Sequence, residues 1–264
     1  MPAPSLTRCR SRLALGLATV LLLGACVGER PTLSDKREPL TTTPVAPDAA
    51  LRNPPSVVAQ AKGDAIAVYD DDSVATPTER FDGGEITAAK ATSAPGIPIV
   101  FLVKGAGETN GRYEVYLPVR PNGSTGWVRA EDVDVTTVVF KIEVTLAEHT
   151  LRVLDGEDVI VEEPIGVGTA DTPSPGGIYY LKELLQPPDP NGVYGVYAYG
   201  LSGFSNVLLS FNGGDGVIGI HGTNNPASIG GDVSSGCIRL NNDVISRLVK
   251  EIGLPLGTPV EIIA

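Results

Sequence analysis

Residues 221–241 bring together the residue types of a cysteine nucleophile. The stretch holds the only histidine downstream of position 149 and the only cysteine downstream of position 26. An imidazole that takes a thiol proton also stabilises the resulting thiolate, so the pair gives a nucleophile at neutral pH. We predict nucleophilic catalysis, with Cys237 as the nucleophile and His221 as the general base.

Glycines at positions 222, 230, 231 and 236 surround these two residues. Backbone that curls around a reacting carbonyl needs dihedral angles that glycine adopts easily, and amide N–H groups aimed at the oxygen stabilise its negative charge. We predict an oxyanion hole formed by the amides of Ser235, Gly236 and Cys237. The carbonyl of Gly222 is expected to orient the second ring nitrogen of His221.

Each of these residues also has a structural interpretation. A histidine that ends an apolar strand, here residues 217–220, is often a satisfied buried residue, and a lone cysteine often behaves as a small hydrophobe. Their joint occurrence in one glycine-rich motif favours catalysis. His149 falls in a predicted turn and is expected to be solvated. The remaining soft ligands are too few for a conventional zinc site, so we predict no metal and no cofactor.

The motif also resembles a known family signature. Ile220-His221-Gly222-Thr223, followed after a short insert by Ser234-Ser235-Gly236-Cys237-Ile238-Arg239-Leu240-Asn241, is similar to that of the L,D-transpeptidase (YkuD) family. Upstream, Thr172-Pro173-Ser174-Pro175-Gly176-Gly177 resembles the TP-x-P-x-G segment of that family. Many members have histidine at the position of Ser235, so only the backbone N–H of this serine is expected to contribute. The resemblance covers roughly residues 138–264.

This resemblance implies a peptidoglycan L,D-transpeptidase. Such an acyltransferase uses a tetrapeptide stem as donor, forms a thioester on Cys237, and transfers the acyl group to the amine of a second stem. The resemblance implies peptide stems as partners, a YkuD-type β-sandwich fold and inhibition by carbapenems. The alternatives are an L,D-carboxypeptidase or a protein-to-wall attaching enzyme of the same fold, and a non-catalytic wall-binding lipoprotein.

The sequence offers four candidate substrate-binding residues. Arg239 could meet a substrate carboxylate through two hydrogen bonds, or brace backbone carbonyls. Asn241, the last residue of the motif that resembles the family signature, is the second candidate. The resemblance places a lid near residues 182–202, where prolines and glycines alternate with tyrosines. Tyr197 and Tyr199 are predicted to contact substrate there, and an aromatic strand packed on the core is the alternative.

The amino-terminal residues predict export. Arg8, Arg10 and Arg12 precede an apolar run, and Leu23-Gly24-Ala25-Cys26 resembles the bacterial lipoprotein box. We predict a lipoprotein signal peptide at residues 1–25 and lipidation of Cys26, which would anchor the protein to the outer face of the cell membrane, in the wall or periplasmic space. A plain secretory signal is the alternative. Cys237 would then be the sole free thiol.

Charge and composition exclude some classes of protein. The chain has 20 basic and 31 acidic residues, and the predicted signal removes only three positive charges, which leaves a formal charge of −14. Such a balance argues against nucleic acid as a partner, because phosphates bind basic patches.

With 31 glycines, 22 prolines and a single methionine, the chain is predicted to be mainly β.

Patterning divides the remainder into three parts. Residues 26–55 lack aromatic residues and are predicted to be a flexible tether. Residues 56–136 contain short β-prone runs and end on a segment around Trp127 that resembles a bacterial SH3-like domain. Trp127 is expected as its core anchor, and binding of a wall polymer is the alternative. Residues 137–264 are predicted to form the catalytic domain. Hairpins are expected at 140–162, a strand at 217–221, one helix at 243–252 with Asn242 as N-cap, and a last strand at 257–263.

Overall fold

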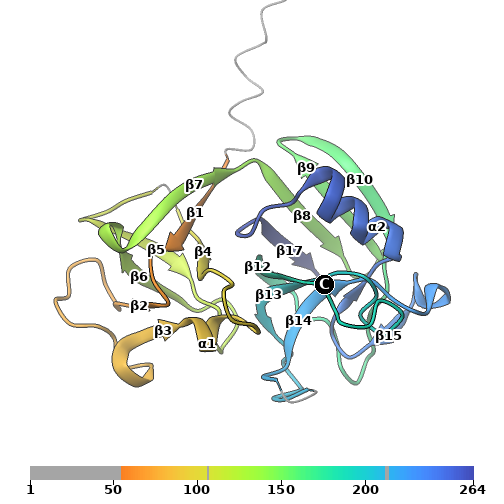
Figure 1. Ribbon diagram of the computed structural model, residues 1–264, viewed down its shortest axis with the longest axis horizontal. Helices are drawn as coiled ribbons and strands as arrows, with labels where there is room; N and C mark the ends of the chain where they lie inside the picture. The colour runs from red at the N-terminus through yellow and green to blue at the C-terminus, as the bar shows by residue number, and fades with distance from the viewer. Residues whose placement is uncertain (1–54, 106, 212–213) are drawn as a thin grey trace, which may run out of the picture. The chain divides into compact units, whose positions relative to one another are not determined.

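The computed structural model describes residues 55–105, 107–211 and 214–264, which all belong to one compact unit of the chain, Ala46–Ala264. The signal peptide predicted for residues 1–25, the lipidation of Cys26 and nearly all of the predicted tether lie outside the described residues. Within the described ranges, no helix is long and apolar enough to cross a bilayer. The structure is mainly β (Figure 1), which confirms the predicted fold class.

Short antiparallel sheets form the first half of the described chain. The largest has the order β4-β1-β7, while β2 pairs with β3 and β5 pairs with β6. Their shared core is built around the buried side chains of Phe101, Val115 and Val128. The elements are β1 (Ser56–Ala61), β2 (Ala65–Ala67), β3 (Glu85–Thr87), the short helix α1 (Ala88–Ala91), β4 (Val100–Leu102), β5 (Arg112–Tyr116), β6 (Thr125–Arg129) and β7 (Val133–Val138).

Trp127 lies outside this core, so its predicted role as core anchor is wrong. Strand β6 alternates, and Gly126 and Val128 are buried while Trp127 is half-buried on the other face. A Cβ atom at Gly126 would lie 2.6 Å from a methyl of Val68, so the inner face has no room for a large side chain there. Phe101 and aliphatic side chains fill the core instead.

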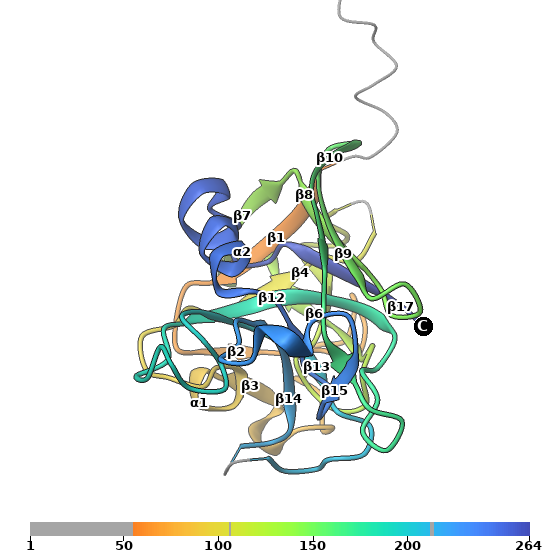
Figure 2. The same cartoon turned by 90° about the vertical axis from the view of Figure 1, so that its right-hand side faces the viewer.

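The second half folds into one curled mixed sheet (Figure 2). In the described residues its order is β10-β9-β8-β17-β12-β13-β14-β16, in which β17 runs parallel to β8 and β14 parallel to β16. The predicted hairpins, the strand at 217–221 and the last strand are confirmed. The strands are β8 (Phe140–Thr145), β9 (Thr150–Asp155), β10 (Asp158–Pro164), β12 (Gly177–Leu185), β13 (Ala198–Phe204), β14 (Val217–His221), β16 (Ile238–Arg239) and β17 (Pro259–Ile263), and a separate parallel pair joins β11 (Val167–Gly168) to β15 (Asp232–Ser234).

The helix predicted after Cys237 is present. It begins as α2 (Asn242–Arg247), continues as a π-helical turn (Leu248–Ile252) and ends at Gly253, whose φ of 68° is one that glycine adopts without strain. The predicted N-cap is wrong by one residue: Asn241 holds the cap position, with φ −61° and ψ 149°. Asn242 is thereby free to use its side chain elsewhere.

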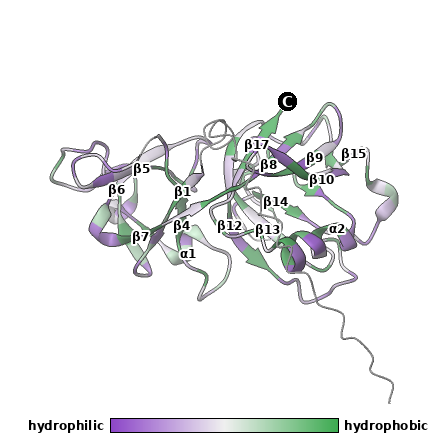
Figure 3. Cartoon of the chain, turned by 90° about the horizontal axis from the view of Figure 1, so that it is seen from above, coloured by the Kyte–Doolittle hydropathy of each residue, from purple (hydrophilic) through white to green (hydrophobic). Residues whose placement is uncertain are grey.

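Alternating apolar residues build the core of the large sheet. In β8 and β9 the buried positions are Ile142, Val144, Leu151 and Val153. The helix after Cys237 adds apolar residues to the same core, and Figure 3 shows hydrophobic residues along the strands of this half. Full burial of one such side chain contributes about 1.5–3 kcal/mol. This packing fixes the strands that end at the candidate site.

A further apolar cluster joins the two halves of the described chain. Tyr180, on β12, is fully buried with Val58, Val100 and Leu102 of the first half. Gly257 lies so close to Val58 that a Cβ atom on this glycine would be 2.3 Å from a methyl group of the valine. The two halves therefore share a packed interior.

We predict that Gly257→Ala destabilises the protein more than Gly253→Ala. Both glycines have left-handed backbone, with φ of 88° and 68°, which costs an alanine about 1–2 kcal/mol. Only Gly257 lacks space for a Cβ atom, and overpacking adds about 1–3 kcal/mol. Urea unfolding of the two variants measures the difference. Equal losses in the free energy of unfolding would show that the close packing of the two halves at Gly257 adds nothing to the cost of the alanine.

Candidate active site

The sheet brings His221 and Cys237 together. His221 is the last residue of β14, and Cys237 directly precedes β16. These two strands pair in parallel, with Ile220 opposite Ile238 and His221 opposite Arg239. The end of one strand and the start of the other therefore lie at neighbouring positions, although a glycine-rich segment separates them in sequence.

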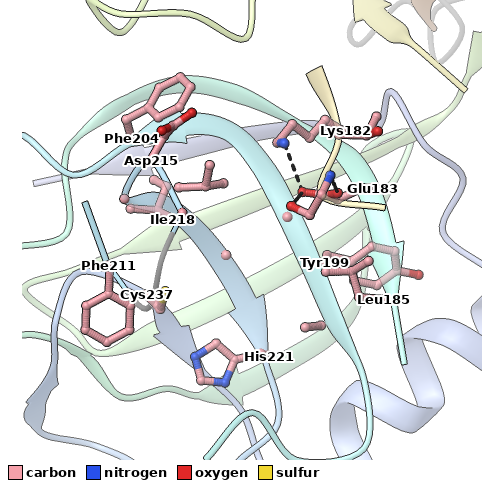
Figure 4. A pocket seen from close by; sticks show the side chains of 18 of the residues that line it. Lys182, Glu183, Leu185, Tyr199, Phe204, Phe211, Asp215, Ile218, His221 and Cys237 are labelled. Carbon is pink, nitrogen blue, oxygen red and sulfur yellow. Dashed lines mark hydrogen bonds and ion pairs between the residues drawn. The ribbon is translucent and has the colours of Figure 1, made fainter. Parts of the chain in front are cut away.

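Both residues line one pocket of about 600 Å³ (Figure 4). The pocket runs from Cys237 and His221 over β14, β13 and β12 to a segment of the first half at and after α1. Figure 4 shows Cys237, His221 and Phe211 in one part of the pocket and Lys182 with Glu183 in another. The other described residues of the wall include Tyr194, Tyr199, Gly200, Asp215, Ile218 and Gly219, and Ala89, Lys90, Thr92 and Ser93.

The imidazole of His221 is buried and oriented by backbone. Its Nδ1 lies 2.6 Å from the carbonyl oxygen of Gly222, so Nδ1–H donates and Nε2 carries the lone pair. The ring of Tyr194 meets it edge-on, with centroids 5.0 Å apart and an interplanar angle of 73°. Burial lowers the pKa of His221 to about 4; the hydrogen bond to Gly222 opposes this shift, and the positive charge of Arg239 adds to it.

Cys237 is half-buried, and its environment keeps the thiol protonated. Burial raises the pKa of the thiol, while a backbone hydrogen bond from Gly219 and the charge of Arg239 act in the opposite direction. With the pKa of His221 lowered, both groups are neutral at pH 7. These shifts favour the neutral thiol–imidazole pair over the thiolate–imidazolium pair expected from the residue types.

Two serines hold the loop around Cys237. The hydroxyl of Ser234 accepts the N–H of Gly236 at 3.1 Å and donates to the carbonyl of Cys237 at 2.5 Å. The hydroxyl of Ser174 donates to the carbonyl of Gly236 at 2.9 Å. The amide of Gly236, one of the predicted oxyanion-hole donors, is thus already bonded. The hydrogen bonds of the described residues leave the N–H groups of Ser235 and Cys237 without a partner.

The segment at 172–177 supports this loop. The hydroxyl of Thr172 donates to the carbonyl of Ser234 at 3.2 Å, and the hydroxyl of Ser174 also accepts the N–H of Gly168 at 2.9 Å. A Cβ atom at Gly168 would lie 2.4 Å from the carbonyl oxygen of Thr172. The TP-x-P-x-G pattern therefore corresponds to backbone that packs against the cysteine loop.

Asn242 is a supporting residue that sequence reasoning assigned only to helix capping. Its Oδ1 accepts the N–H of Thr223 at 3.1 Å and that of Val196 at 3.4 Å. The first contact lies just after His221, and the second lies in the predicted lid. Glycines at 195 and 222 leave room for this side chain, because a Cβ atom at either would lie within 2.1 Å of Oδ1. A polar residue at the start of a helix was the only signal in the sequence.

Of the predicted substrate-binding residues, only Tyr199 is among the described residues that line the pocket. Tyr199 is 1% exposed and donates to the carbonyl of Leu254 at 3.2 Å, as expected of the core alternative. The ring of Tyr197 contacts Lys250, with the ammonium 5.4 Å from its centroid. Of the tyrosines in the predicted lid, Tyr194 is the one beside His221.

Arg239 and Asn241 are also absent from the described wall of the pocket. Arg239 is half-buried on β16, and its Nε atom is buried without a hydrogen-bond partner. Its charge reaches both His221 and Cys237. Asn241 caps α2 with its backbone. The structure therefore supports an electrostatic effect of Arg239 on His221 and Cys237. Its predicted contact with substrate stays a prediction.

Two polar pairs near the site were not predicted. Lys182 and Glu183 form a buried ion pair of 2.9 Å in the pocket wall; the only hint in the sequence is two adjacent charges inside an apolar strand. His149, expected to be solvated, has its Nε2 atom 2.8 Å from Asp232, which precedes the cysteine loop. In the described ranges, no group of three or more His, Cys, Asp or Glu residues is placed to hold a metal ion.

Comparison with known proteins places the second half in a family. A family model of the L,D-transpeptidase catalytic domain (YkuD) matches residues 140–262. The putative L,D-transpeptidase YkuD of Bacillus licheniformis is 36% identical over 126 residues, which cover 48% of this chain and 67% of the relative. Its Bacillus subtilis counterpart is 36% identical over 129 residues, which cover 49% and 69%.

Solved structures that resemble this chain match it at lower sequence identity. The Bd1075 protein of Bdellovibrio bacteriovorus is 31% identical with a TM-score of 0.36, over 47% of each chain. An L,D-transpeptidase from Mycobacterium smegmatis is 15% identical with a TM-score of 0.38, over 63% of this chain and 90% of that one. The chain thus spans about two thirds of the two Bacillus relatives and about half of the Bdellovibrio protein. Because the family model spans His221 and Cys237, and the chain covers two thirds or more of the two Bacillus relatives at 36% identity, the chain belongs to the YkuD family of L,D-transpeptidase catalytic domains.

Proposed function

We propose that this protein is a peptidoglycan L,D-transpeptidase that crosslinks peptide stems through a thioester on Cys237. The observation that carries the proposal is the shared pocket: the thiol and an imidazole whose Nδ1 is fixed by the carbonyl of Gly222 line the same cavity. A volume of about 600 Å³ has room for a peptide segment and not merely for a single carbonyl group. Membership of the YkuD family supports the same reaction.

In the first half-reaction, Cys237 attacks the carbonyl of the third residue of a donor stem, which forms the scissile peptide bond with the fourth. His221 takes the thiol proton on Nε2 as the carbon–sulfur bond forms, and the N–H groups of Ser235 and Cys237 stabilise the oxyanion. The tetrahedral intermediate collapses to a thioester. The carbon–nitrogen bond breaks, and the departing D-amino acid takes the proton from His221.

In the second half-reaction, the amine of an acceptor stem attacks the thioester. His221 takes a proton from this amine, the new peptide bond forms, and the sulfur leaves and regains the proton. The neutral resting pair suits both steps, because His221 is unprotonated whenever a proton has to be accepted. If water replaced the amine, the product would be a shortened stem and the enzyme a carboxypeptidase.

The remaining assignments extend this proposal to the whole chain. We propose that residues 56–136 are an SH3-like domain and residues 137–264 the catalytic domain. A lipid on Cys26 would hold both parts at the outer face of the cell membrane, where peptide stems occur. The short antiparallel strands of the first half support the first assignment, and the lipoprotein-box pattern supports the anchor.

We expect Cys237→Ala to remove turnover while the fold is kept. The side chain is half-buried and small, so its loss leaves little cavity, but no other described cysteine can form the thioester. Mass spectrometry of purified stems incubated with the protein distinguishes crosslinked dimers from shortened stems, and thermal unfolding checks the fold. Crosslinking by the alanine variant would rule out the cysteine mechanism. Shortened stems alone would make the enzyme a carboxypeptidase.

The lowered pKa of His221 predicts the pH dependence of acylation. With a pKa of about 4, the imidazole is already the free base at pH 6, so the acylation rate should stay nearly flat between about pH 6 and 8 and fall toward pH 4. A carbapenem, whose strained amide can occupy the place of the scissile bond, serves as acyl donor, and intact-protein mass spectra follow the adduct. His221→Ala should slow its formation by about 10²–10⁴-fold. A rate that halves near pH 6.5 would mean an unperturbed histidine.

A further inference from the structure

The first half of the chain forms one wall of the pocket that holds Cys237. At the end of the pocket away from Cys237, the wall is formed by Ala89, Lys90, Thr92 and Ser93. They belong to α1 and the residues that follow it, outside the part that the family model matches. The mechanism proposed above gives these residues no role.

A buried ion pair fixes this wall to β12. Lys182 donates to the carbonyl of Ala91 at 2.7 Å and pairs with Glu183 at 2.9 Å. Glu183 accepts the backbone N–H of Ser93 at 2.6 Å and its hydroxyl at 2.9 Å. The side chains of Lys182 and Glu183 are 5% and 1% exposed. Because a buried charge needs its partners, these bonds hold the wall in one position.

The charge of this wall is set by Lys90. The ammonium of Lys182 is neutralised by Glu183 within the wall. Lys90 is exposed on the pocket side of α1, and no ion pair with it occurs among the residues that the structure describes. Asp215, the other charged residue lining the pocket, lies on the segment between β13 and β14. In a chain of strongly negative charge, Lys90 is thus an unpaired cation facing the substrate space.

The spacing of the strands sets which part of a peptide could reach Lys90. Cys237 leads into β16, and β12 lies three strands away, or roughly 14 Å at the usual inter-strand distance. An extended peptide covers about 3.3 Å per residue, and the lysine side chain closes part of the gap. In the proposed reaction the donor has one residue on the carboxyl-terminal side of the scissile bond. One residue is too short to span this distance. The group that reaches Lys90 therefore lies on the amino-terminal side of that bond.

We propose that Lys90 is a specificity-determining residue that pairs with a carboxylate of the donor peptide, on the amino-terminal side of the scissile bond. The Lys182–Glu183 pair positions the wall that carries it. This inference rests on the proposed function, because it requires a peptide donor at Cys237. It makes the first half part of substrate recognition.

Two donor peptides test it, identical except that an acidic residue on the amino-terminal side of the scissile bond carries a free carboxylate in one and a carboxamide in the other. Binding is measured by calorimetry on the Cys237→Ala protein, and kcat/KM on the protein with its cysteine. We expect the carboxylate peptide to be preferred about tenfold, the order of one charge-assisted hydrogen bond. Lys90→Ala should abolish the preference and Lys90→Arg should restore it.

Lys62→Ala is the matched control. It removes the same charge from the same half, but Lys62 contacts Glu131 and Asp134 away from the pocket. This variant should keep the preference. Glu183→Gln should raise KM more than it lowers kcat, as expected if the wall shifts while Cys237 stays in place.

A preference that survives in Lys90→Ala, or is absent from the parent protein, would overturn the inference. So would failure of both peptides to bind. Absence of turnover together with a Lys90-dependent binding preference would instead refute only the proposed reaction. The binding arm therefore separates the two failures.

Discussion

The parallel pairing of β14 with β16 is the constraint on which the site depends. Parallel neighbours cannot be joined by a tight turn, so the chain must leave the sheet after His221 and return before Cys237. The excursion is held by β15 against β11 and by hydrogen bonds from Ser174 and Ser234. His221 at the end of one strand and Cys237 just before its neighbour are then brought close together by sheet geometry.

Burial gives this pair its chemical character. Desolvation lowers the pKa of His221 and raises that of Cys237, so both shifts favour the uncharged forms. The thiolate is the form that oxidants attack, and a resting thiol is correspondingly protected.

The sequence predicted the features that are encoded locally. The alternation of β8 and β9, the strand that delivers His221 and the glycine that ends the helix all follow from short-range patterns, and the motif around Cys237 indicated the residues that meet there. Contacts between distant residues left no such pattern. Glu183 and Ser93, or Ser174 and Gly236, lie far apart in the chain and are joined only by the tertiary fold.

Errors in the prediction have the same cause. Trp127 was expected in a core because tryptophan is large and apolar, but alternation along β6 and the close approach of Val68 to Gly126 decide which face is buried. Asn242 was expected to cap the helix, but Asn241 holds that position and the Oδ1 of Asn242 accepts the N–H groups of Thr223 and Val196 instead. In each case a neighbour that the local sequence does not reveal determined the outcome.

The order of strands in the large sheet has a consequence for how the protein is made. Strand β17, the last in sequence, lies between β8 and β12. Before it is synthesised, the meander β8–β10 and the strands β12–β16 have no common neighbour, and each presents an open edge to the other. Strand β12 therefore gains its second neighbour in the sheet only when residues 259–263 insert into the gap. A nascent chain or one shortened at this strand would carry His221 and Cys237 on half a sheet, with two edges open to pairing with other chains.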